Sequence, residues 1–211
     1  MKIQKFVFND FSENTFILWD EVSRESAIVD PGCNDSFEEE ELDRFIYQNN
    51  LSVKYLFNTH GHIDHVLGNA YVKLKYNPEF WFPKEDQFIL EKLEEIGNNY
   101  GIKTKVSPLP DKYFDESINL LLGESIIKPL FTPGHSPGEI CLYVKDDKFC
   151  ITGDVLFYEG IGRTDLWGGN FNTLENSIRT KLFVLQADTI IYPGHGPEST
   201  IQHEKENNPY L

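Results

Sequence analysis

Three of the six histidines of this chain stand within the segment NTHGHIDH, residues 58–65. Neutral imidazoles and a carboxylate form a ligand set suited to zinc, iron or manganese. A spacing this dense has no rationale in packing, so it indicates metal chemistry. The segment predicts four metal ligands, which are His60, His62, Asp64 and His65.

Three further candidate ligands each follow an expected strand. They are His135 after strand 125–131, Asp154 after strand 148–152 and His195 after strand 189–192. A glycine precedes each of them and permits a tight turn and a close approach of the backbone to a metal. Ligands of open α/β sheets gather beyond the carboxyl ends of strands, so we expect one site that contains all seven residues.

The elements that must position these side chains are short and mixed in type. Apolar runs predict strands at 2–8, 14–19, 26–30, 53–57, 125–131, 139–145, 148–152 and 189–192. Amphipathic spacing and capping residues predict helices at 35–49, 65–76, 84–100, 174–185 and 198–207. Residues 101–115 are expected to form a loop. Because both halves mix strands and helices and no linker separates them, we expect a single α/β or α+β domain over residues 1–211.

Composition excludes several classes of function. The 211 residues include 19 Lys and Arg against 34 Asp and Glu, which gives a net charge of −15. An acidic surface disfavours nucleic acid and anionic membranes, because both need clustered basic residues. The 40% hydrophobic and 14% aromatic content excludes a disordered chain. We therefore expect a small-molecule substrate, with no nucleic-acid, membrane or protein partner.

The cysteines and the N-terminus indicate the compartment. The three cysteines are odd in number and have no CxxC spacing, which fits a reducing environment. Cys141 and Cys150 are close enough to face each other across a hairpin, but buried free thiols are the favoured interpretation. No segment matches a signal peptide or a membrane span, so we expect a cytoplasmic protein.

On these motifs the sequence resembles the metallo-β-lactamase-fold hydrolase superfamily, and within it the small glyoxalase II-like (hydroxyacylglutathione hydrolase-like) group. The resemblance rests on Asp30-Pro31-Gly32, the HxHxDH motif, GIGRTD at 160–165, PGHGP at 193–197 and the ending Glu204 with NPYL at 208–211. It implies a four-layer αββα sandwich with the site at one edge of the two sheets. Full-length glyoxalase II enzymes carry an added C-terminal helical domain, which we expect to be absent because the chain ends soon after His195.

The resemblance also implies roles for individual residues. It puts His60, His62 and His135 on a first metal ion, Asp64, His65 and His195 on a second, and Asp154 between the two. The two divalent ions are expected to be zinc first, with iron or manganese as the alternatives. It further implies that Arg163 binds the glutathione carrier, with Tyr158 beside it. Pairing of Arg163 with Asp165 is the competing role for this guanidinium.

These implications favour a dinuclear metal-dependent hydrolase of S-acyl thioesters, with S-lactoylglutathione as one candidate substrate. Water bound to the metals would have its pKa lowered to about 7, and the resulting hydroxide would attack the carbonyl. Asp64 or Asp154 would orient that hydroxide, so no Ser or Cys nucleophile is needed. True β-lactamases of this fold usually lack the full HxHxDH motif together with a bridging Asp, which disfavours lactam hydrolysis.

Two alternatives stay open at this point. A persulfide dioxygenase shares the fold and a GRTD-like loop, and it would use a single ferrous ion on His60, His135 and Asp154. A non-catalytic metal-binding scaffold is the third hypothesis and has the least support, because seven complete ligands exceed what such a scaffold needs.

Overall fold

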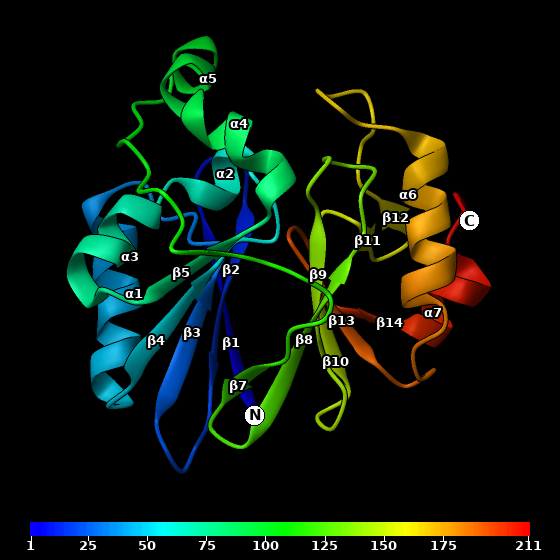
Figure 1. Cartoon of the computed structure of the whole chain (residues 1–211), viewed down its shortest axis with the longest axis horizontal. Coiled ribbons are helices and arrows are strands. Elements are labelled where there is room, and N and C mark those ends of the chain that lie inside the picture. Colours follow the sequence, from blue (N-terminus) through cyan, green and yellow to red (C-terminus); the bar gives the residue numbers. More distant parts are fainter.

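Two six-stranded mixed sheets face each other in the computed structural model, which describes all of residues 1–211 (Figure 1). The first sheet has the strand order β1 (Lys2–Phe8), β2 (Glu13–Trp19), β3 (Glu25–Val29), β4 (Ser52–Phe57), β5 (Glu79–Phe82) and β6 (Lys112–Tyr113). The second has the order β14 (Ser199–Thr200), β13 (Ile190–Pro193), β10 (Phe149–Gly153), β9 (Ile140–Val144), β8 (Ser125–Phe131) and β7 (Leu120–Leu122). A separate short pair consists of β11 (Leu156–Phe157) and β12 (Gly160–Ile161).

Helices cover the outer face of each sheet (Figure 1). The first sheet carries α1 (Ser36–Gln48), α2 (Ile63–Val66), α3 (Asn69–Tyr76), the 3-10 turn η1 (Lys84–Asp86), α4 (Gln87–Glu91) and α5 (Leu93–Tyr100). The second sheet carries α6 (Phe171–Ser177), its π-helical continuation η2 (Ile178–Leu182) and α7 (Ile201–Asn207). This αββα order confirms the predicted four-layer sandwich. None of the helices has the length and apolar character needed to cross a membrane.

The core forms as three apolar layers because strand side chains alternate between the two faces of a sheet. On β2, Phe16 and Leu18 point toward the second sheet, whereas Ile17 points toward the helices of the first. All three side chains are buried, since both faces of this strand are covered. On the far side, Leu174 and Ile178 pack on the outer face of the second sheet. The three cysteines are buried and free, as predicted.

Two predicted helices are interrupted. The segment 65–76 divides at Gly68, where a Cβ would lie 2.5 Å from the Cys33 sulfur, so the chain packs there too closely for a side chain. The segment 84–100 divides at Lys92 into α4 and α5. In both cases the amphipathic spacing is correct, but the helix is broken within the predicted span.

Strand β5, which lies next to the edge strand β6 of the first sheet, was not predicted. Its four residues, EFWF, are too few to show an alternating pattern, and they lie between Pro78 and Pro83. Parallel pairing with β4 and β6 makes this segment a strand. The partner β6 also lies inside the expected loop 101–115, so pairing with another part of the chain defines both segments.

The inter-sheet layer predicts which apolar side chains hold the fold together. Leu142 on β9 is fully buried between the sheets, so Leu142→Ala should lower the free energy of unfolding by about 2–5 kcal/mol through lost burial and a cavity. Leu121 on β7 is 53% exposed, and Leu121→Ala should change it by less than about 0.5 kcal/mol. Urea unfolding of both variants checks the difference, and equal effects would contradict this assignment of the core.

Candidate metal centre

Loops from both sheets deliver the seven predicted ligands to one point. Four come from the loop after β4 and from α2, and three follow β8, β10 and β13. Asp30, just after β3, fixes the first loop, because its carboxylate accepts hydrogen bonds from the Thr59 amide at 2.7 Å and the Thr59 hydroxyl at 2.6 Å. Asp30 itself has a left-handed backbone, with φ of 49°, which is a strained conformation of a kind found at functional sites.

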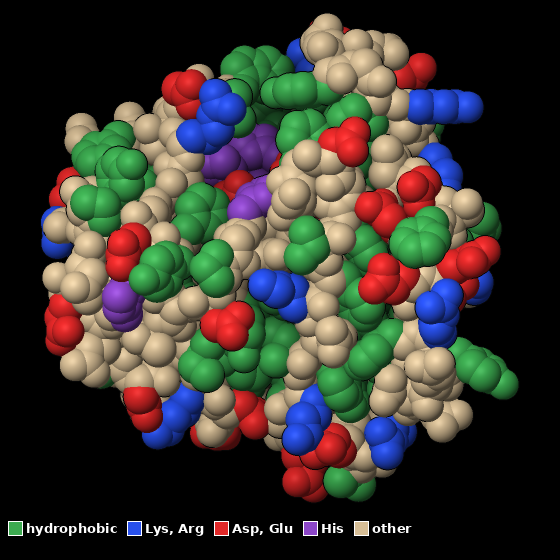
Figure 2. Space-filling model, turned by 180° about the vertical axis from the view of Figure 1, so that it is seen from behind, with side chains coloured by type: hydrophobic (Ala, Val, Ile, Leu, Met, Phe, Trp, Pro, Cys, Tyr) green, Lys and Arg blue, Asp and Glu red, His purple; other side chains and the backbone are tan.

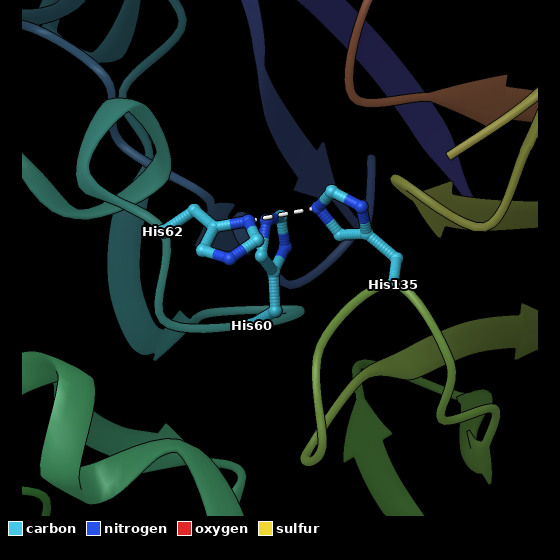
Figure 3. A group of neighbouring side chains, drawn as sticks. All are labelled: His60, His62 and His135. Carbon is cyan, nitrogen blue, oxygen red and sulfur yellow. Dashed lines mark hydrogen bonds between the residues drawn. The ribbon is translucent and has the colours of Figure 1, made fainter. Parts of the chain in front are cut away.

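The first group of ligands is made of three histidines. Ligand atoms of His60, His62 and His135 all lie within 4.8 Å of one another. The rings point toward a common centre from two different loops, with His62 Nδ1 2.8 Å from His135 Nε2 (Figure 3). Three imidazole nitrogens at this separation match one side of a tetrahedral zinc site with an open position.

The second group lies beside the first and contains a carboxylate. Ligand atoms of Asp64, His65 and His195 also lie within 4.8 Å of one another. Asp64 Oδ2 is 3.1 Å from His195 Nε2 and 3.6 Å from His65 Nε2. The rings of His60 and His65 are 4.2 Å apart between centroids, so the two groups are adjacent.

Asp154 stands between the two groups. Its Oδ2 is 3.4 Å from His135 Nε2 and its Oδ1 is 3.5 Å from His65 Nε2. The neighbouring loop must approach closely, because a Cβ at Gly194 would lie 2.4 Å from Asp154 Oδ1. One carboxylate therefore faces both sets of ligands.

Outer hydrogen bonds fix how these histidines present their nitrogens. His135 Nδ1 lies 2.7 Å from the Arg163 carbonyl and His195 Nδ1 lies 3.3 Å from the Ser12 carbonyl. A carbonyl only accepts, so both Nδ1 atoms carry the proton, and each Nε2 lone pair faces the centre. His65 Nδ1 donates to Asp30 in the same way, at 3.1 Å.

The centre fits a metal because its inward atoms lack partners. His60 Nε2, His65 Nε2 and Asp154 Oδ1 are buried and have no hydrogen-bond partner. Such groups cost free energy unless something satisfies them. Burial and the neighbouring His135 lower the pKa of His62 to about 3, so this imidazole is neutral and able to bind a cation. Burial by itself lowers the pKa of His65, but the carboxylates of Asp64 and Asp154 raise it, and the net pKa lies above its ordinary value. A cation bound at His65 would therefore displace a proton from this imidazole.

Sequence analysis missed four buried acidic side chains around the ligands, namely Glu13, Asp30, Asp86 and Glu139. Asp30 shares the signal of the ligands, a polar residue directly after a strand. The other three carry no such signal. Glu13 and Glu139 each stand at the start of an observed or expected strand, and Asp86 stands in a charged helical segment. Burial raises the pKa of the Glu13 and Glu139 carboxyls. Glu139 Oε1 accepts a hydrogen bond from the Asp154 amide at 2.8 Å, which fixes the backbone of that ligand.

A cleft of about 750 Å³ opens onto the centre. Figure 2 shows histidines and a carboxylate at the bottom of a hollow bordered by hydrophobic side chains. The walls are largely apolar and include Phe11, Ile89, Ile96, Tyr100, Phe157, Ile161, Leu166 and Trp167. This arrangement can hold an organic substrate with its reacting group at the ligands.

Two cations line this cleft, Arg163 and Lys92. Arg163 makes a bidentate ion pair with Asp165, at 2.7 and 2.8 Å, and the guanidinium lowers the pKa of Asp165 to about 2.

Lys92 has no carboxylate within ion-pair distance, and its ammonium lies 4.7 Å from the centre of the Trp167 ring. Tyr158 does not line the cleft, because its exposed ring stacks on His203, 5.1 Å away.

Known proteins share this architecture. A model of the metallo-beta-lactamase superfamily matches residues 9–195. The chain belongs to this superfamily. Over its full length this metallo-beta-lactamase superfamily member is 39% identical to hydroxyacylglutathione hydrolase GloC from Haemophilus influenzae, of which the match spans 98%. These matches confirm the predicted resemblance and support a metal-dependent hydrolase.

Two solved structures of the superfamily are similar to the whole chain. One is described as BLEG-1 B3 metallo-beta-lactamase, with 28% identity, a TM-score of 0.90 and coverage of 100% of this chain and 99% of that one. The other is TTHA1623 in a di-iron-bound form, with 28% identity, a TM-score of 0.88 and coverage of 99% and 100%.

Metal binding should stabilise this superfamily member, because it satisfies the inward-facing atoms only in the folded state. At a free metal concentration 100 times Kd, the gain is about 2.7 kcal/mol, or about 5–10 °C in Tm for a chain of this size. Thermal unfolding of chelator-treated protein, with and without added zinc, iron or manganese, measures it. A Tm that none of the three metals changes would contradict the metal centre.

Proposed function

We propose that this protein is a hydrolase of S-acyl thioesters that holds two divalent cations per chain, with zinc the first candidate. The observation that carries this proposal is the position of Asp154, whose two oxygens face His135 on one side and His65 on the other. A single ion would need only one of these groups. A carboxylate placed between two complete groups suits two ions that share it.

The chemistry needed is hydrolytic. Divalent cations held by these residues would lower the pKa of a bound water to about 7 and polarise a carbonyl oxygen. Asp64 and Asp154 place carboxylate oxygens at the floor of the cleft, where they can accept a proton from the attacking water and orient it. The apolar walls limit access of bulk water to the reacting carbonyl.

A thioester suits this cleft better than an amide. A thiolate leaves without protonation, because thiols have a pKa of about 8.5, whereas an amide nitrogen must receive a proton. The histidines of the cleft, His62, His135 and His195, are all assigned here as ligands and are not free to supply that proton. The GloC relative, named as a hydroxyacylglutathione hydrolase, makes a glutathione thioester such as S-lactoylglutathione the first substrate to test.

A β-lactam is the second candidate substrate, because the structure described as a B3 metallo-beta-lactamase matches the whole chain. A lactam nitrogen would need a proton donor, for which Lys92 and Tyr100 are the available groups of the cleft. Parallel assays with a chromogenic β-lactam separate the two substrates.

His195→Ala distinguishes two ions from one, since only the second group uses this residue. We expect wild-type protein to bind two ions and the variant one, with thioester hydrolysis lowered by at least about 100-fold. Metal analysis and S-lactoylglutathione turnover give the two readouts. His203→Ala is the matched control, because His203 contacts Glu159 outside the centre and should leave both readouts unchanged.

One iron per chain, with oxygen consumed in the presence of glutathione persulfide, would instead establish the dioxygenase alternative on His60, His135 and Asp154. In that case His195→Ala would retain its metal.

We also propose that Arg163 binds the anionic end of the substrate in competition with Asp165. Arg163→Ala should raise KM for a glutathione thioester by about 5-fold, which corresponds to about 1 kcal/mol, with kcat little changed. Asp165→Asn should lower KM because it releases the guanidinium. Steady-state kinetics of both variants, beside Lys92→Ala, decide which cation acts. A raised KM in Lys92→Ala alone would assign this role to Lys92.

A further inference from the structure

A buried carboxylate outside the ligand groups lies between the loops that carry the first three histidines. Asp86, the last residue of η1, has no solvent exposure and belongs to neither group of ligands. Burying a carboxylate costs free energy unless its oxygens accept hydrogen bonds. The donors that satisfy Asp86 therefore indicate why the residue is placed here.

All three donors belong to the two metal-centre loops. Asp86 Oδ2 accepts from the Gly61 amide at 2.9 Å and from the Ser136 hydroxyl at 2.7 Å. Asp86 Oδ1 accepts from the Gly138 amide at 2.6 Å. Gly61 stands between ligands His60 and His62, and Ser136 directly follows ligand His135. One side chain thus joins the loop of two ligands to the loop of the third.

Both loops approach Asp86 as closely as glycine allows. A Cβ at Gly138 would lie 2.8 Å from Asp86 Oδ1, and a Cβ at Gly61 would lie 3.1 Å from Asp86 Cβ. A backbone hydrogen bond from Ile140 to Thr59, 3.0 Å long, also joins the loops at the start of β9. Asp86 supplies the contacts next to the histidines themselves.

We propose that Asp86 is a positioning residue that sets the separation of these two loops, and through it the geometry of the His60, His62 and His135 group. This inference rests on the proposed metal centre but not on any substrate. It predicts that loss of the carboxylate weakens metal binding at this group, while the group of Asp64, His65 and His195 keeps its affinity.

Zinc affinity, measured by competition with a chromogenic chelator, tests this role. Asp86→Ala should weaken one of the two binding steps by about 10–100-fold, the usual effect of removing an outer partner of a metal site. Asp86→Asn should have an intermediate effect, because its oxygen still accepts from Gly61 and Ser136 while its NH₂ group faces the Gly138 amide. Ser136→Ala removes one contact only and keeps the series measurable if Asp86→Ala does not fold.

Glu204→Ala is the matched control. Glu204 is buried on α7, and its carboxylate accepts from the Glu159 amide at 2.9 Å, from Asn208 Nδ2 at 2.8 Å and from the Ser199 hydroxyl. This variant should lose thermal stability as Asp86→Ala does, with both zinc affinities unchanged. Equal zinc affinities in wild type, Asp86→Ala and Asp86→Asn would overturn the proposal.

Hydrogen exchange of metal-free protein separates this inference from the proposed metal centre. Asp86→Ala should speed exchange of the Gly61 and Gly138 amides, and Glu204→Ala should not. If wild-type protein binds no metal, the proposed centre fails, and the exchange rates still decide whether Asp86 joins the loops. Unchanged exchange at both glycines would overturn the inference whether or not metal binds.

Discussion

The structure depends on one electrostatic constraint, which is that the lone pairs of several buried nitrogens and oxygens must converge on one point. Five imidazoles and two carboxylates do not hold themselves in this arrangement, because His60 Nε2, His65 Nε2 and Asp154 Oδ1 have no hydrogen-bond partner among them. The surrounding chain therefore supplies the missing stabilisation. Asp30 binds Thr59 and His65, Glu139 binds the Asp154 amide, and carbonyls bind the outer nitrogens of His135 and His195.

This constraint explains why acidic side chains are buried in an enzyme whose surface is already acidic. Glu13, Asp30 and Glu139 lie behind the ligands, away from the cleft. There Asp30 accepts hydrogen bonds from the Thr59 amide and from His65, and Glu139 accepts one from the Asp154 amide, so these two carboxylates orient ligands.

Much of the fold and of the ligand set could be predicted from the sequence because both follow local patterns. Strands β2, β3 and β4 show apolar runs of sufficient length, and the HxHxDH segment is compact in the chain. Strands β5 and β6 could not be predicted, since only pairing between distant segments defines them. Asp86 was missed for the same reason. Nothing within its own helical segment indicates where its hydrogen-bond donors lie. Gly61 stands 25 residues before Asp86 in the chain, and Ser136 and Gly138 stand 50 and 52 residues after it.

The separation of the ligands along the chain has a mechanical consequence. The first group joins residue 60 to residue 135, and the second joins residue 64 to residue 195. Metal ions on these groups would therefore close long loops and fasten one sheet to the other, as disulfides do in secreted proteins. A chain whose three cysteines are all free would gain its covalent-like cross-links from its cofactor. These links would form when metal ions bind and break when the ions dissociate. Catalysis and the attachment of one sheet to the other would therefore depend on the same ions.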